Sequence, residues 1–143
     1  MFIKQLSIFV ENKPGRLSNI AKLLGENGID IRALSVADTR DFGILRIIVN
    51  KPDEACEILK KADCTVSITN VIAIAVKDEP GGLSEIMEAL YAANISVEYM
   101  YAFLSKSDDQ AYVILRVDSN DRAINAMKEN NFKVLTSQEV YNM

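Results

Sequence analysis

The chain contains one short turn twice, first as Asn12-Lys13-Pro14-Gly15-Arg16-Leu17 and, 66 positions later, as Asp78-Glu79-Pro80-Gly81-Gly82-Leu83. Each copy follows an apolar, strand-like segment and opens a helix-like segment, which predicts a strand-to-helix turn. Proline fixes its own φ angle, and glycine lets the backbone turn where a Cβ atom would clash. We expect the leucine that ends each copy to begin the buried face of a helix.

The segments around the two turns repeat the order β-α-β-β-α-β. In the first half the apolar patterns predict strands over 2–10, 29–38, 44–49 and 64–69, with helices over 17–27 and from Pro52. In the second half they predict strands over 71–76, 95–104, 111–117 and 132–140, with helices from Leu83 and after 118–120. Residues 39–41 and 105–109 are predicted hairpin turns. The sequence therefore predicts two domains, 1–69 and 70–143.

The repeat is supported by identities as well as by pattern. Between positions 8–29 and the positions 66 later, nine of 22 residues are identical, which is more than patterning alone explains. Beyond the second hairpin the offset becomes 68, as in Val49 and Val117 or Asp53 and Asp121. One two-residue insertion in that hairpin accounts for the change.

Composition limits the function classes. The 143 residues are 49% hydrophobic and 25% charged, which is typical of a globular protein with a real core. The net charge of −4 argues against nucleic acid, which needs a surplus of lysine and arginine. The sequence has no long apolar run and no signal-peptide pattern at its start, so we expect no membrane partner and a cytoplasmic protein.

Catalytic and metal chemistry have little support in the sequence. There is no histidine, which removes the commonest general base and the usual nucleophile pairs, and Cys56 and Cys64 are expected to be structural thiols. We expect no catalytic residues, no metal and no cofactor.

The two turns resemble the Asp/Asn-x-Pro-Gly-x-Leu signature of the ACT domain. The resemblance extends through the first helix to Gly28-Ile29-Asp30-Ile31, which is similar to that family's Gly-Ile/Val-Asn-Ile, and it covers both halves of the chain. It implies an α+β fold of two ferredoxin-like βαββαβ domains, with antiparallel sheets and helices on one face. It also implies a non-catalytic regulatory protein that binds a free amino acid between paired domains. The expected partners are a second copy of the chain, forming a dimer, and an amino-acid biosynthetic enzyme.

The resemblance also carries over to particular residues. Family members hold the amino acid with an Asn two positions before the Pro and an Asn at the start of the second strand. The matching positions here are Asn12 and Asp30, then Asp78 and Ser96, and the second half has Asn94 where the first has Gly28. The complete set of expected ligand-binding residues is Asn12, Pro14, Gly15, Arg16, Leu17, Asp30, Ile31, Asp78, Pro80, Gly81, Gly82, Leu83, Ser96 and Val97.

Pairing of the two domains through their second strands would define two sites. Within one domain the turn and the start of the second strand lie at opposite ends, so antiparallel pairing brings each turn beside the other domain's strand. We hypothesise one site from Asn12 with Ser96 and a second from Asp78 with Asp30. Backbone N–H groups of each turn are candidates for binding an α-carboxylate, helped by Arg16 in the first site. The two carboxylates of the second site repel unless a cation lies between them.

Several alternatives stay open at this point. Asn12 and Asp78 are also residue types that cap helices. An enzyme would have to use close aspartates such as Asp108 and Asp109, which turns favour for backbone reasons. An RNA-binding module would need exposed aromatic residues on its central strands. A regulatory interaction subunit without its own ligand is the main alternative, with Tyr99, Tyr101 and Phe103 on one strand face as its interface.

Overall fold

The computed structural model describes residues 2–38, 41–104 and 109–143. The first half contains β1 (Ile3–Glu11), α1 (Arg16–Glu26), β2 (Ile31–Asp38), β3 (Phe42–Val49) and α2 (Pro52–Lys61). Strand β4 (Thr65–Lys77) leads into the second half, which contains α3 (Gly82–Ala92), β5 (Val97–Ala102), β6 (Gln110–Val117), α4 (Asn120–Glu129) and α5 (Ser137–Tyr141).

All the strands belong to one antiparallel sheet in the order β2-β3-β1-β4-β6-β5. The long strand β4 belongs to both halves: its first part, Thr65–Val71, pairs with β1, and its last part, Ile72–Lys77, pairs with β6. The domain boundary predicted between Thr69 and Asn70 therefore falls inside a continuous strand.

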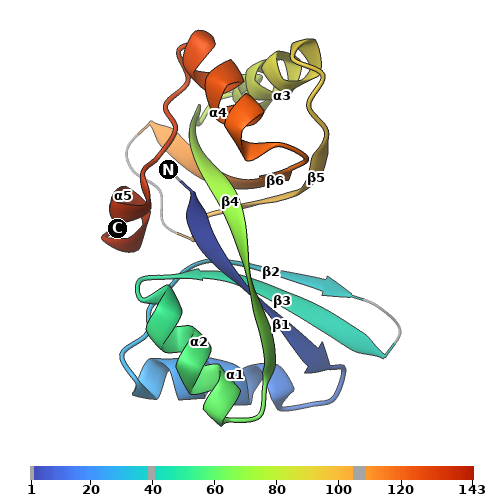
Figure 1. Ribbon diagram of the computed structural model, residues 1–143, viewed down its shortest axis with the longest axis vertical. Coiled ribbons are helices and arrows are strands. Elements are labelled where there is room, and N and C mark those ends of the chain that lie inside the picture. Colours follow the sequence, from blue (N-terminus) through green and yellow to red (C-terminus); the bar gives the residue numbers. More distant parts are fainter. Residues whose placement is uncertain (1, 39–40, 105–108) are drawn as a thin grey trace.

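Each half has its own core between its helices and its part of the sheet. In Figure 1, α1 and α2 cover the outer face of the first half, and α3 and α4 cover the outer face of the second. Ile8, Leu24 and Ile47 are fully buried in the first core, and Ile74, Ile86 and Leu115 are fully buried in the second.

The remaining faces of the two half-sheets pack against each other and form a third, central core. Ile3 and Ile48 of the first half meet Ala73 and Ile114 of the second there, and Val140 of α5 covers one side. The two edge strands approach each other as well: Ala33 of β2 forms an antiparallel bridge with Phe103, just after β5. The sheet thus folds over so that its two edges meet at one point.

The predicted element order is confirmed except at its C-terminal end. The strand predicted over 132–140 is wrong, because this segment makes only one bridge to β4, between Val134 and Ile74. It then turns into α5, whose capping box joins Thr136 and Glu139 reciprocally. The tip residues 39–40 and 105–108 of the two predicted hairpin turns lie outside the described residues.

The expectation that Leu17 and Leu83 begin the buried helix faces is also wrong. Both side chains are 44% exposed. The first buried side chain is Ile20 in α1 and Ile86 in α3, although the backbone of Gly82, at the start of α3, is buried as well.

Gly28 and Asn94 occupy equivalent positions in the two halves. Both residues adopt left-handed backbone conformations, with φ of 72° and 56°. Asparagine tolerates that conformation better than most residues.

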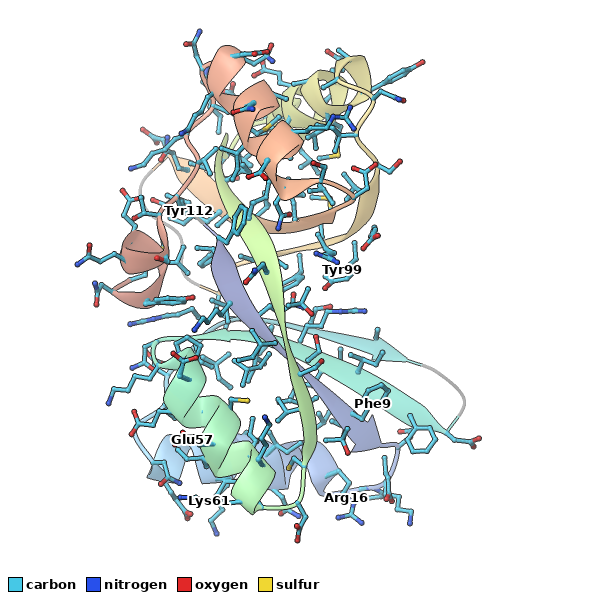
Figure 2. The ribbon with its side chains drawn as sticks, in the orientation of Figure 1. Phe9, Arg16, Glu57, Lys61, Tyr99 and Tyr112 are labelled. Carbon is cyan, nitrogen blue, oxygen red and sulfur yellow. The ribbon has the colours of Figure 1, made fainter. Side chains whose placement is uncertain are left out.

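A polar network around Gln5 connects the two halves. Gln5 is fully buried; its Nε2 donates to the Tyr99 hydroxyl (2.8 Å) and to Ser7 Oγ (3.2 Å), and its Oε1 accepts from the Tyr101 hydroxyl (2.6 Å). The Arg46 guanidinium lies 3.8 Å above the Tyr99 ring. The aromatic face of β5 that suggested an interface with another protein therefore packs against the chain's own first half (Figure 2).

The Tyr101 hydroxyl gives this contact a predicted pH dependence. Burial, and next the neighbouring Tyr99, raise the pKa of Tyr101 well above its usual value near 10. Above about pH 10, Tyr101 loses its hydroxyl proton in the unfolded chain but keeps it in the folded chain. The free energy of unfolding therefore falls as the pH rises, by up to ~1.4 kcal/mol per pH unit. Denaturant unfolding measured between neutral and strongly alkaline pH should show this slope, and Tyr101→Phe should reduce it. Equal slopes in both proteins would contradict the assignment.

Candidate functional site

The first Pro-Gly turn joins β1 to α1 without a capping side chain. Gly15 is the N-cap of α1, in a left-handed conformation with φ of 87°, and no side chain caps the helix. Asn12 therefore does not act as the helix cap; its N–H donates to the carbonyl of Asp41 (3.2 Å). The Arg16 N–H is already bonded to the Lys13 carbonyl (3.3 Å). Gly15, Arg16 and Leu17 were the expected anion-binding residues. Because the N–H of Arg16 is already bonded, Arg16 can bind an anion through its side chain but not through its backbone.

Charged side chains surround this turn. The Glu11 carboxylate bonds to Lys13 Nζ (3.1 Å) and lies 3.6 Å from the Arg16 guanidinium. These two cations, Lys13 first, lower the pKa of Glu11 below its usual value. The group carries two positive charges and one negative charge, so it can attract an additional carboxylate.

The second turn has the same backbone with less space. Gly81 is the N-cap of α3, with φ of 87°, and again no side chain caps the helix. The Gly82 N–H donates to the Glu79 carbonyl (3.0 Å), and the Asp78 N–H donates to the Asp109 carbonyl (3.0 Å). A Cβ atom on Gly82 would collide with the carbonyl of Lys77. The second turn therefore has no room for a counterpart of Arg16.

The two predicted strand starts differ in charge. Asp30 lies just before β2 and forms an ion pair with Arg32 Nη1 (2.9 Å), while its N–H donates to Asn50 Oδ1 (2.9 Å). Ser96 lies just before β5, and its carbonyl accepts from the N–H of Asp118 (3.2 Å). Ile31 and Val97, which follow them, are half-buried against the cores of their own halves.

Main-chain contacts join the edge strands of the two halves near Asp30. At the strand junction, defined here as Asp30, Arg32, Ala33, Phe103 and Leu104, the Leu104 N–H donates to the carbonyl of Arg32 (3.0 Å). In the second half, the Asp78 N–H donates to the carbonyl of Asp109 (3.0 Å). Residues 105–108, between Leu104 and Asp109, lie outside the described residues, and a site from Asp78 with Asp30 stays a prediction.

The other predicted pair, Asn12 and Ser96, forms main-chain hydrogen bonds within separate halves. Among the described residues, Asn12 bonds to Asp41 and Ser96 bonds to Asp118, each within its own half. The contacts between the two edges are made by Phe103 and Leu104, which follow the end of β5, whereas Ser96 lies just before its start. A site from Asn12 and Ser96 stays a prediction.

Arg32 is the residue that the sequence reasoning missed. Its guanidinium forms the ion pair with Asp30, and its side chain is 21% exposed. The available signal was its opposite charge, two residues after Asp30.

Other kinds of site find no support in the described part of the chain. Within residues 2–38, 41–104 and 109–143, no three Cys, Asp or Glu side chains gather in a way that could hold a metal ion. None of the helices described is long and apolar enough to cross a membrane.

The architecture defines the class of protein: two ferredoxin-like units of βαββαβ type in tandem, each with a Pro-Gly turn before its first helix, the last strand of the second being reduced to one bridge. The family follows from comparison with known proteins. A family model described as an ACT domain pair matches residues 1–143, and the chain belongs to that family.

Individual relatives agree with this assignment. A crystal structure of a Bacteroides thetaiotaomicron protein superposes with a TM-score of 0.94 at 38% identity, covering 100% of this chain and 98% of that one. The regulatory subunit of aspartate kinase from Thermus thermophilus shares the fold, with a TM-score of 0.65 at 15% identity over 90% of this chain and 92% of that one.

Two curated relatives are each 29% identical to this chain. The aspartokinase of Corynebacterium glutamicum matches 84% of this chain, and the acetolactate synthase small subunit of Mycobacterium bovis matches 63%. The chain spans 31% of the first relative and 64% of the second.

Proposed function

We propose that this protein is a non-catalytic, cytoplasmic regulatory protein that binds a free amino acid where its two ACT domains meet. The observation that carries the proposal is the ion pair of Asp30 and Arg32 at the strand junction. An exposed carboxylate beside a guanidinium complements the ammonium and carboxylate groups of an amino acid. In this proposal, the second Pro-Gly turn supplies the remaining contacts with the amino acid, through Asp78, Pro80, Gly81, Gly82 and Leu83.

The regulated partner in this proposal is an amino-acid biosynthetic enzyme. The names of the relatives support it, since they include aspartokinase and an acetolactate synthase small subunit. The active form in the proposal is a homodimer, and the equally exposed Leu17 and Leu83 are available for contacts between two copies.

The test is thermal unfolding against the twenty amino acids, followed by calorimetric titration of each hit. A ligand present at about 100 times its Kd should raise Tm by several degrees. Asp30→Asn and Asp78→Ala should remove this shift, because each takes away an ammonium partner. The matched control is Asp53→Asn, since Asp53 also forms an exposed ion pair, with Lys4 (2.8 Å), but is not one of the proposed binding residues.

The outcome separates this function from its alternative. A shift in Tm that survives in both Asp30→Asn and Asp78→Ala would contradict the proposed site. If no amino acid changes Tm, the interaction-subunit function is favoured, and affinity purification of the tagged chain should recover an enzyme partner.

A further inference from the structure

The second half covers only part of the inner face of the first half-sheet, the face that points away from α1 and α2. Along β1, alternate side chains on this face become more exposed: Gln5 is fully buried, Ser7 is half-buried and Phe9 is 55% exposed. Along β3, Ile48 is fully buried, whereas Phe42 is 51% exposed. The end of this face that is remote from the central core is therefore open.

Apolar side chains continue across the open end. Phe9 of β1 pairs with Ile44 of β3, and Ile44 pairs with Ala37 of β2, so these three residues form one row across the sheet. Phe42 lies on the same face because it is two residues before Ile44. We call these four residues the inner patch. Single exposed apolar residues are ordinary on protein surfaces, but a group with two exposed phenylalanine rings indicates an interaction surface.

The second half shows how the fold covers the same row. The counterpart row is Ala75, Tyr112 and Phe103, which are also joined across neighbouring strands. Phe103 is only 9% exposed, and both aromatic residues pack in the central core, to which α5 contributes Val140. Figure 2 shows Tyr112 on the same side of the molecule as α5 and Phe9 on the opposite side. A short helix of the chain itself thus helps to cover this row in the second half.

The first half has no counterpart of that helix. The positions that correspond to α5, 68 residues earlier, are 69–73, and they lie within β4. Strand β4 continues into the second half instead of folding back over the first half-sheet. The row of apolar side chains is therefore present in both halves, but a helix of the chain packs near it in only one. A helix is accordingly the kind of partner element that fits the inner patch.

The charges beside the inner patch favour an acidic partner. Arg46 is two residues beyond Ile44 on β3, and its guanidinium lies 3.8 Å above the ring of Tyr99 in the second half, so the patch is continuous with the interface between the halves. Among the residues that the structure describes, no carboxylate forms an ion pair with Arg46. Glu11, at the opposite border, is already bonded to Lys13 (3.1 Å). A partner carboxylate beside Arg46 would form a charge-assisted hydrogen bond.

We propose that the inner patch is the docking surface for an acidic amphipathic helix of the enzyme that this protein regulates. The apolar side of that helix packs on Phe9, Phe42 and Ile44, and one of its carboxylates bonds to Arg46. Apolar residues three and four positions apart on a helix reach neighbouring strands of such a surface. This proposal rests on the enzyme partner of the function proposed above, but it does not depend on amino-acid binding at the strand junction.

The experiment uses three synthetic helical peptides of about 15 residues that share one leucine stripe. Their other positions carry mainly glutamate, glutamine or lysine. Fluorescence anisotropy should show the glutamate peptide binding the full chain about tenfold more tightly than the lysine peptide. Because the chain has a net charge of −4, non-specific attraction favours the lysine peptide, so the opposite preference reports a local site.

Variants of the full chain locate that site. Phe9→Thr and Ile44→Thr, which keep a residue suited to a strand, should each weaken binding of the glutamate peptide by about tenfold. Arg46→Gln should weaken binding of the glutamate peptide but not of the glutamine peptide. The matched control is Tyr91→Ala, which removes an 83% exposed aromatic side chain from α3 and should leave binding unchanged.

Purified aspartokinase and acetolactate synthase from the same organism identify the source of the helix. Binding of one of these enzymes should fall in Phe9→Thr and should be competed by the glutamate peptide. No peptide binding, or equal enzyme binding by the wild-type chain and both threonine variants, would overturn the docking surface and leave the proposed function intact. Failure of both enzymes to bind would contradict the proposed enzyme partner as well. A dimer that dissociates in Phe9→Thr, seen by sedimentation velocity, would assign the patch to a second copy and overturn the proposal.

Discussion

Replacing Gln5 with alanine is expected to lower the free energy of unfolding by about 3–5 kcal/mol. The change leaves a cavity at a fully buried position and removes the partner of the Tyr99 and Tyr101 hydroxyls. Emptying a buried site of this size costs roughly 2–5 kcal/mol, and an unpaired buried hydroxyl adds about 1–3 kcal/mol. Denaturant unfolding, with its slope checked for two-state behaviour, measures the loss.

Two further variants separate the cavity from the hydrogen bonds. Gln5→Leu restores most of the volume and should cost about 1–3 kcal/mol, because the hydroxyls stay unpaired. Adding Tyr101→Phe to Gln5→Leu should recover part of that loss, since the buried hydroxyl is then gone. A double variant as unstable as the sum of its single variants would show that the network is not a coupled unit.

Replacing Gly82 with alanine is expected to destabilise the fold by about 2–3 kcal/mol. The new Cβ atom would collide with the carbonyl of Lys77, which belongs to the backbone and cannot rotate away as a side chain would. Crowding of this kind typically costs about 1–3 kcal/mol, occasionally more, and the higher helix propensity of alanine offsets at most about 1 kcal/mol of it. Calorimetric unfolding should show the loss as a drop in Tm of several degrees.

The first half provides the matched control for this variant. Arg16→Ala changes the corresponding position, where a side chain is already accommodated, and removes only an exposed ion pair with Glu11. Its expected cost is below about 1 kcal/mol. If Gly82→Ala and Arg16→Ala had the same free energy of unfolding, the predicted clash between a Cβ atom at position 82 and the carbonyl of Lys77 would be contradicted.

The duplicated turns made most of the architecture predictable. A Pro-Gly pair has few backbone conformations available, so two copies before amphipathic helices define two equivalent strand-to-helix connections. The strand order and the two outer cores follow from the apolar faces of the elements. The structure reproduces both turns with the same φ of 87° at Gly15 and Gly81.

The central core was not predictable from periodicity. Gln5 and Ser7 occupy the polar positions of an alternating strand, which normally indicates a solvent-exposed face. In the structure that face is covered by the second half, and its polar groups are paired with tyrosine hydroxyls instead of water. Alternation distinguishes the two faces of a strand but does not say what covers them. Likewise, the helical period places Leu17 in line with Ile20 without showing where the sheet below the helix ends.

The C-terminal segment was misread although its sequence contained a clear signal. Thr136 and Glu139 have the spacing of a capping box, which predicts a helix start. The analogy with the first half favoured a strand instead. A duplicated fold need not complete its last strand, because β4 already joins the two halves and α5 covers the central core.

Of the candidate site, the sequence predicted Asp30 but not its ion pair with Arg32 or the contact of the two edge strands beside it. The edge strands are distant in sequence, and a single bridge between them leaves no periodic pattern. A cavity of about 370 Å³ between the start of α1 and the segment that joins α2 to β4, with Cys64 in its lining, was also missed. Aligning the two halves beyond their identities would have drawn attention to it, because Phe9, Arg16 and Cys64 all differ in type from their counterparts.

The shared strand β4 also limits how the length of this chain can change. Val66, Ile72, Ile74 and Val76 face the helices, while Val71 and Ala73 face the central core, so one alternation of side chains runs through both halves. Inserting or deleting one residue near Asn70 would turn the helix-facing set of one half toward the other half. Insertions or deletions at this point are therefore compatible with the fold only in steps of two residues. A flexible linker between two domains would not impose this restriction.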